Sequence, residues 1–215
     1  MKKRKGNAYM VSKDSRCSSA FLRNEFSCEG RWNFAIVKKQ QIDLNGLDLI
    51  AFSDTKPHDN HNTHKGVHFF VDDYRFESVY NTPERPLPKL GQYRFVLTPQ
   101  FSCYAEMKMW RQIESIGKSR WCGAYWQSKG MKVIPSLCWS LYPSFEFCFD
   151  GIEKGSIVAV GTIGCRHGKT NFMRGYNYML KKIDPEAIIC FGKPFSEMKG
   201  NIISINYNAS RKVVR

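Results

Sequence analysis

The chain has 215 residues, the length of one domain with short tails. Hydrophobic residues make up 42% and charged residues 24%, so the composition is that of a globular protein and excludes a mostly disordered chain. No run of eighteen apolar residues occurs, and no apolar stretch follows the basic N-terminus. We therefore expect neither a membrane-spanning helix nor a secretory signal.

The net charge of +14 is the first functional indication. Residues 1–16 carry six basic and one acidic side chain (+5), and residues 208–215 carry three basic ones (+3), which leaves +6 for the body. A field of this sign attracts polyanions and speeds encounter with them. Nucleic acid or another polyphosphate is therefore the expected partner, and the alternative is that the charge serves solubility alone. A membrane partner is not expected, because the basic tails lack the interleaved aromatic and leucine residues of an amphipathic anchor.

Eight cysteines are spread along the chain without any Cys-x-x-Cys pair. Several lie in apolar stretches, where a reduced thiol behaves as a small hydrophobic group. This distribution favours reduced cysteines and a cytoplasmic location over a disulfide framework or a structural zinc site.

Residues 1–32 are predicted to form a basic, irregular N-terminal arm, residues 33–207 a single α/β domain, and residues 208–215 a basic C-terminal tail. Short apolar runs rich in Val, Ile and Phe recur through the domain, as in strands that are buried on both faces. These runs cover residues 47–52, 67–71, 93–97, 132–134, 157–160, 187–191 and 202–205. They predict a mainly parallel sheet of about seven strands with crossover helices, either open or closed as a small or incomplete (β/α) barrel.

Two long helices are expected between these runs. The first should begin after Ser102, a good N-cap residue, and end before Gly130. The second should begin near Thr170 and end at Asp184, which precedes a proline. A shorter helix is expected over residues 144–149, and residues 54–66 are expected to form a mobile polar loop.

Candidate sites lie where the predicted strands end, because parallel α/β folds form their sites beyond the carboxyl ends of the strands. The run 67–71 is followed by Asp72 and Asp73, with Glu77 a few residues later. Such carboxylates could serve as a general base or bind Mg²⁺. Mg²⁺ is the one cofactor that we consider, and no residue pattern requires a cofactor. The alternative is that Asp73 is the N-cap of a helix and Glu77 lies in its first turn.

The run 157–160 leads into a glycine-rich loop that contains Arg166 and Lys169 and precedes a helix. Free backbone N–H groups and a helix N-terminus can receive a phosphate there. The loop is not a P-loop, because Ile163 stands where that motif needs glycine. Lys193 follows the next run and would converge on the same region if the two strands are neighbours. The alternative is an ordinary βα loop.

Aromatic residues could provide stacking surfaces for bases. Trp139 follows a predicted strand and is the best candidate for an exposed surface, with Tyr125 as a second. Arg120 could pair with a phosphate or a carboxylate, whereas Trp110 and Trp121 are assigned to the core.

Four histidines at positions 58, 61, 64 and 68 raise the question of a metal site, but Pro57 and Gly66 favour a loop. Which metal would bind, if any, stays unknown.

Several distinctive strings together resemble a known family. They are Val67-His-Phe-Phe-Val-Asp-Asp-Tyr-Arg-Phe-Glu77, Trp121-Cys-Gly-Ala-Tyr-Trp-Gln127, Ser144-Phe-Glu-Phe-Cys-Phe-Asp-Gly151, Val158-Ala-Val-Gly-Thr-Ile-Gly164, Phe191-Gly-Lys-Pro-Phe195 and Ala209-Ser-Arg-Lys-Val-Val-Arg215. The chain is similar, over about residues 34–215, to an uncharacterised bacterial domain family found largely in phages, prophages and mobile elements. This resemblance implies a genomic context and no reaction, so no catalytic residue follows from it.

Three hypotheses for the function remain open. The first is a cytoplasmic phage or mobile-element protein that binds nucleic acid and in a stronger form also processes it. The second is a phosphate- or nucleotide-binding α/β enzyme that uses the carboxylates at residues 72, 73 and 77. The third is a non-enzymatic protein that binds or inhibits a host protein. The sequence does not decide whether the protein is an enzyme.

Overall fold

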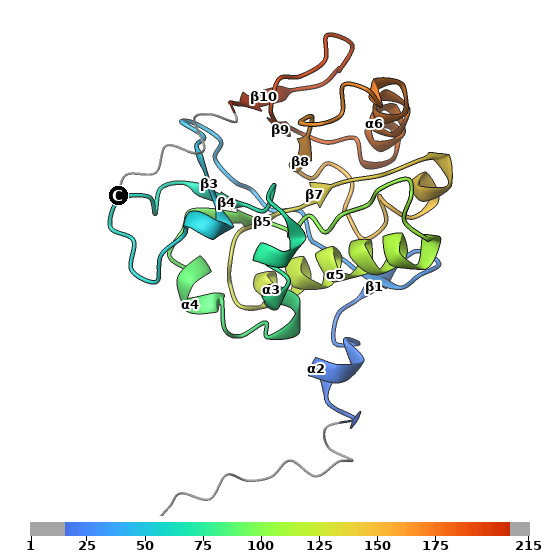
Figure 1. Ribbon diagram of the computed structural model, residues 1–215. Coiled ribbons are helices and arrows are strands. Elements are labelled where there is room, and N and C mark those ends of the chain that lie inside the picture. The colour runs from blue at the N-terminus through green and yellow to red at the C-terminus, as the bar shows by residue number, and fades with distance from the viewer. Residues whose placement is uncertain (1–15, 207–215) are drawn as a thin grey trace, which may run out of the picture.

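The computed structural model describes residues 16–206 and places short parallel strands against two long helices (Figure 1). Two four-stranded sheets share one parallel strand direction. The first has the order β3 (Leu49–Ala51), β4 (Gly66–His68), β5 (Phe95–Leu97), β6 (Val133–Ile134). The second has the order β10 (Ile202–Ile205), β9 (Ile188–Phe191), β8 (Val158–Gly161), β7 (Ser136–Leu137). The α/β class and a strand in each of the seven predicted runs are thereby confirmed.

A single proline joins the two sheets. Pro135 separates β6 from β7, so one extended segment pairs with β5 through Val133 and Ile134 and with β8 through Ser136 and Leu137. Proline has no N–H to donate to a sheet, which interrupts the strand at this point. The strands therefore follow one another in space in chain order, from β3 at one edge to β10 at the other. The two edges do not pair with each other within residues 16–206, so the fold is open and not a closed barrel.

Strands β3 to β9 are buried on both faces, as their continuous apolar character predicts, whereas the edge strand β10 is only partly buried. Side chains along each strand alternate between two cores. Ile50, Val96, Val160 and Cys190 belong to the larger core, which also contains helix residues. The smaller core draws on both sheets and contains Leu49, Phe95, Leu97, Ile134, Ala159, Ile189, Phe191 and Ile205. Because both sheets supply this smaller core, they curve around it.

The two long helices lie between the predicted strands, as expected, but the first begins later than predicted. Helix α5 (Met109–Ser128) packs on the first sheet, and α6 (Lys169–Ile183) lies beside β8 and β9 (Figure 1). The predicted start of the first helix after Ser102 is wrong by several residues, because the Ser102 hydroxyl and N–H bind a carboxylate and do not cap a helix. The second helix is confirmed and ends at Asp184, which adopts a left-handed conformation.

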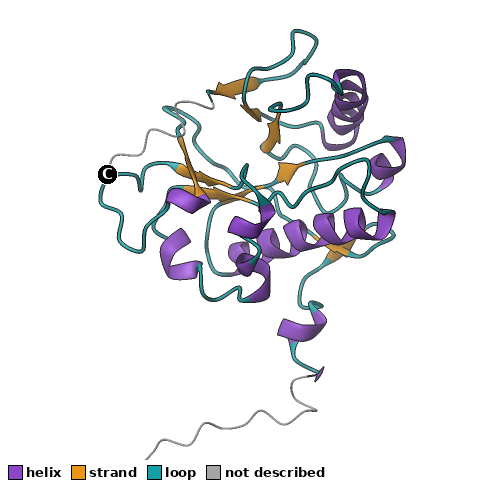
Figure 2. Cartoon of the chain, in the orientation of Figure 1, coloured by secondary structure: helices purple, strands orange, loops and turns teal. Residues whose placement is uncertain are grey.

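Short elements and loops fill the rest of the chain (Figure 2). The helix expected over residues 144–149 is a 3₁₀ turn, η3 (Tyr142–Glu146). The other short helical elements are α2 (Ser19–Leu22), η1 (Phe52–Asp54), η2 (Asp73–Arg75), α3 (Ser78–Asn81) and α4 (Leu87–Leu90). Part of the predicted N-terminal arm packs against the body, because β1 (Cys28–Glu29) pairs with β2 (Phe34–Ala35) and Arg23 lies over the Trp121 ring. Residues 1–15 and the predicted tail 208–215 lie outside the described residues.

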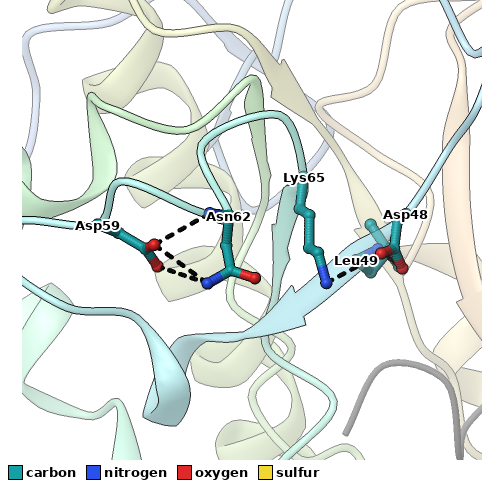
Figure 3. Close-up of polar contacts among 5 residues, drawn as sticks. All are labelled: Asp48, Leu49, Asp59, Asn62 and Lys65. Atoms are coloured by element: carbon teal, nitrogen blue, oxygen red, sulfur yellow. Dashed lines mark hydrogen bonds and ion pairs between the residues drawn. The ribbon is translucent and has the colours of Figure 1, made fainter. Parts of the chain in front are cut away.

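The polar loop 54–66 is anchored, which corrects the expectation that it is mobile. Asp59 is buried, and its carboxylate accepts hydrogen bonds from the N–H groups of His61 and Asn62, the Asn62 amide and the Tyr93 hydroxyl at 2.9–3.1 Å. Lys65, also buried, forms an ion pair with Asp48 at 3.0 Å beside β3 (Figure 3). A sequence pattern does not show these contacts, because Tyr93 and Asp48 lie outside the loop.

Acid should weaken this anchor. Burial alone would raise the pKa of Asp59, but the hydrogen bonds outweigh it and lower the pKa from 3.8 to about 2. A carboxylate with a lowered pKa stabilises the fold above its unfolded-state pKa and loses that contribution as the pH falls through its folded-state pKa. The expected contribution at pH 7 is about 2 kcal/mol, lost between about pH 4 and pH 2.

Urea unfolding of the wild type and Asp59→Asn measures this effect. The variant should be less stable at pH 7, and the difference between the two proteins should shrink by about half at pH 3. Asp54→Asn is a suitable control because Asp54 is an exposed residue in the same loop. A difference between wild type and Asp59→Asn that is constant from pH 7 to pH 3 would show that the charge of Asp59 does not stabilise the loop.

Candidate functional site

A cleft of about 870 Å³ opens at the carboxyl ends of the strands. Residues that end or follow β3, β4, β5, β7, β8 and β9 all contribute to its wall. Parallel α/β folds place binding sites at this edge, because the loops that leave the strands converge there. The cleft is therefore the candidate functional site of the chain.

Eight aromatic residues contribute to the wall. They are Phe69, Phe70, Tyr74, Phe101, Tyr104, Trp139, Phe172 and Phe191. The rings of Phe70 and Phe191 stack with their centroids 4.6 Å apart, which brings the end of β4 against β9 across the smaller core. Tyr74 and Tyr104 are exposed at the opening. Flat apolar surfaces of this kind suit a planar ring such as a nucleobase.

The structure places two of the three predicted carboxylates at the cleft. Asp73 accepts hydrogen bonds from the N–H of Ser102 at 3.0 Å and from its hydroxyl at 2.9 Å, so the segment after β5 fixes this carboxylate. Asp72 is more exposed and pairs with Arg75 at 3.8 Å. Glu77 does not line the cleft. Asp73 is the first residue of η2 and its carboxylate binds Ser102, while Glu77 precedes α3, so the capping alternative does not describe these helices.

The predicted basic loops border the cleft. Strands β8 and β9 are neighbours, and the loops that follow them touch where the Thr162 hydroxyl donates to the Lys193 carbonyl at 3.0 Å. Ile163 and Cys165 of the first loop line the cleft, whereas the adjacent Arg166 is exposed, as is Lys193. Lys169 instead forms an ion pair with Glu197 at 2.6 Å. Arg166 and Lys193 are therefore exposed on loops that border the cleft, although neither residue lines it.

Two predicted contact residues lie in the interior instead. Arg120 is fully buried and donates to the carbonyls of Asp150, Ser136 and Cys148, so it cannot reach a phosphate outside. Tyr125 is 8% exposed and stacks on Trp121, which leaves it no free face for a base. Both residues lie on the inner side of α5. The expectation that Trp110 belongs to the core is also wrong, since this residue is 65% exposed.

Trp139 lies between the core and the cleft. Its indole contacts Phe172 with ring centroids 5.0 Å apart and lies directly against Gly175 of α6. It is half-buried and lines the cleft, so it offers part of its surface to a ligand. Trp139 is therefore only partly exposed, and a stacking role for it stays a prediction.

The sequence pattern indicates His68 only as one of four histidines for a metal site, and the structure places it at the end of β4, where it borders the cleft. His68 is 2% exposed and lines the cleft. Its Nδ1 accepts the N–H of Phe70 at 3.2 Å, and its Nε2 is buried without a hydrogen-bond partner in the described part of the chain. Burial lowers the pKa of His68 to about 3. A histidine inside an otherwise apolar strand run was the available signal.

Three cysteines also line the cleft, namely Cys103, Cys138 and Cys165. Burial raises the pKa of the Cys165 thiol, and the Cys103 thiol together with burial raises that of Cys138. These thiols are therefore protonated at neutral pH and are poor nucleophiles. All eight cysteines lie within residues 16–206 and are free, as the prediction of reduced thiols requires.

Within residues 16–206, no three His, Cys, Asp or Glu side chains come together in a group that could hold a metal ion. The histidines of the 54–68 segment therefore do not form a joint site. Three carboxylates line the cleft, namely Asp54, Asp72 and Asp73.

A second hollow of about 610 Å³ lies between η3 and the outer face of α6. Tyr142 and Tyr178 line it together with the exposed cations Arg174 and Lys181. It combines aromatic surface with positive charge. Any test of ligand binding at the cleft therefore needs variants of this second hollow as a control.

Comparison with known proteins identifies the family. A family model described as a domain of unknown function (DUF4417) matches residues 27–208. The chain belongs to this family, which covers both sheets and the cleft. The resemblance seen in the sequence is thereby confirmed.

Two curated phage proteins are similar to the chain. The gene 1 proteins of Mycobacterium phages L5 and D29 are each 42% identical to it over 130 residues, or 59% of this chain. That region covers 57% of the L5 protein and 48% of the D29 protein, so the chain spans about half the length of the curated relatives it matches. No solved structure matches the chain. None of the helices in residues 16–206 has the length and apolar character needed to span a membrane.

Proposed function

We propose that this phage-associated protein binds single-stranded nucleic acid through the cleft at the strand ends. The observation that supports this most directly is the position of the aromatic cleft beside the loops that carry Arg166 and Lys193. Bases stack on aromatic side chains regardless of sequence, while cations contact the phosphates. One base would enter the cleft among the rings, and the backbone would run past the two cations.

The carboxylates give the same site a means of processing its ligand. Asp73 is held by Ser102, so its carboxylate is preorganised to accept a proton from a water or a hydroxyl group. Asp72 lies beside it in sequence and could join it in holding a Mg²⁺ ion together with phosphate oxygens. A phosphate- or nucleotide-specific enzyme is the second candidate, because the same groups would serve a small phosphorylated ligand.

Fluorescence anisotropy with labelled single- and double-stranded DNA and RNA tests the proposal. Single strands should bind more tightly than duplexes, and the affinity should fall steeply as the salt concentration rises. Arg166→Gln combined with Lys193→Gln removes two cations at the cleft opening. This double variant should weaken binding by about tenfold at low salt and flatten the salt dependence.

Arg174→Gln combined with Lys181→Gln is the matched control, because it removes the same charge from the second hollow. It should leave binding within about twofold of the wild type. If this variant loses binding while the cleft variant keeps it, the nucleic acid binds between η3 and α6 and the proposed location is wrong. If the wild type binds none of the four nucleic acids at low salt, the proposed function is wrong.

A further inference from the structure

His68 has an assignable proton position. Its Nδ1 accepts a hydrogen bond from the N–H of Phe70, so this nitrogen carries no proton. The proton of the neutral ring is therefore on Nε2, which becomes a hydrogen-bond donor. Burial keeps the ring neutral at physiological pH, since it lowers the pKa to about 3. His68 can thus donate from Nε2 but cannot act as a base there.

This donor is unused within the described residues. The Nε2 atom is buried and has no acceptor, although His68 borders the cleft. A buried donor without a partner carries the cost of its lost hydration. A ligand that places an acceptor on Nε2 recovers this cost, so the free protein is prepared for such a group.

The surroundings of His68 select an uncharged acceptor. The ring packs against Phe191 with centroids 4.5 Å apart and against Phe70 at 5.7 Å. A neutral donor among phenylalanines cannot offset the cost of burying a phosphate anion. The cations Arg166 and Lys193 are exposed on loops that border the cleft, where an anion can stay hydrated.

A second unpaired atom narrows the ligand class. Gln100 follows β5 and borders the cleft, and its Oε1 is buried without a partner among the described residues. Two residues that line the cleft thus each hold a buried polar atom without a partner among the described residues, a donor on His68 and an acceptor on Gln100. A nucleobase edge carries both an acceptor and an N–H donor, whereas a phosphodiester has acceptors only.

We infer that the cleft holds a nucleobase by its edge, with a keto oxygen or ring nitrogen of the base accepting the Nε2–H of His68. The inference rests on the proposed function and gives the ligand a direction: the base lies inside and the phosphate at the opening. It assigns His68 the role of a specificity-determining residue.

Two variants separate this role from a structural one. In His68→Asn, the side-chain oxygen occupies the place of Nδ1 and can still accept the Phe70 N–H, but the distal donor is lost. In His68→Gln, the amide nitrogen reaches the place of Nε2 and keeps the donor, while the contact with Phe70 is lost. Binding of labelled oligothymidylate should weaken about fivefold to tenfold in His68→Asn and stay within about twofold in His68→Gln.

An abasic oligonucleotide of the same length is the control ligand. Its weaker binding should be equal in the wild type and both variants, because it has no base to meet His68. Equal affinities of wild type and His68→Asn for oligothymidylate would overturn the inference and leave the proposed function standing. Failure of the wild type to bind any oligonucleotide would overturn both.

Nitrogen-15 NMR of the wild-type imidazoles tests the inference without relying on the folding of a variant. His68 should show the tautomer protonated at Nε2, with no titration between pH 5 and pH 8. The Nε2–H resonance should shift on addition of thymidine monophosphate and stay in place on addition of inorganic phosphate. A tautomer protonated at Nδ1, or a resonance that thymidine monophosphate does not move, would overturn the inference.

Discussion

Replacing Arg120 by methionine is expected to lower the free energy of unfolding by about 3 kcal/mol. The guanidinium group is completely buried. Its Nε donates to the carbonyl of Asp150 at 2.9 Å, and its two terminal nitrogens donate to the carbonyls of Ser136 and Cys148. Arg120 thus ties α5 to β7 and to the segment that follows η3. Methionine fills similar space but leaves these buried carbonyls without their donor.

Urea unfolding followed by circular dichroism measures this loss. Arg111→Met is the matched control on the same helix, because Arg111 is exposed and pairs with Glu114 on the surface. Such surface pairs contribute about 0.5 kcal/mol or less. Equal stabilities of Arg120→Met and wild type would mean that burying the guanidinium costs as much as its hydrogen bonds contribute.

The second large effect is expected at Gly175, in the middle of α6. An added Cβ would lie 2.2 Å from Nε1 of the Trp139 indole and 2.3 Å from its Cδ1. Alanine would gain about 1 kcal/mol from its helix propensity, but forcing the indole out of a packed site costs more. We expect Gly175→Ala to lower the free energy of unfolding by about 2 kcal/mol. It should also weaken oligonucleotide binding, because Trp139 lines the cleft.

Gly117→Ala distinguishes the steric effect from helix propensity. Gly117 also lies inside a long helix, but a Cβ there would be 3.4 Å from the nearest ring atom of Phe34, an ordinary contact. This control should be neutral or more stable by about 0.5 kcal/mol. Urea unfolding and anisotropy on the two variants give both readouts. If Gly175→Ala is as stable as Gly117→Ala, the indole moves aside without cost and the tight packing does not matter.

The strands were predictable because their burial leaves a direct mark on the sequence. The run 187–191 is apolar throughout, since Cys190 faces the larger core and Ile189 the smaller one. Helix α6 was predictable for a similar reason, with Phe172, Tyr176 and Met179 buried on one face. The start of α5 was not, because Ser102 is a good N-cap by residue type yet binds Asp73 from a neighbouring strand end.

In the candidate site, too, the sequence predicts part of the arrangement and tertiary packing decides the rest. The chain alone places Asp72, Asp73, Arg166 and Lys193 after strands, and parallel pairing then brings these strand ends to one edge. Which side chains reach the cleft depends on packing across the sheets. Arg120 and Tyr125 look like surface groups by residue type, but both lie on the side of α5 that is buried in the protein. The predicted run 67–71 places His68 in a strand, but only the structure shows that it lies beside Phe191 at the cleft.

The sequence by itself determined the α/β class, the positions of the strands and the family, because each depends on local apolar patterns or distinctive residue strings. Only the tertiary structure decided that the sheet stays open, that loop 54–66 is anchored through Asp59, and that His68 has an unpaired donor at an aromatic cleft. These features arise from contacts between residues far apart in the chain. Such contacts leave no periodic signal, because a hydrogen bond or a ring contact depends on where two segments meet in space.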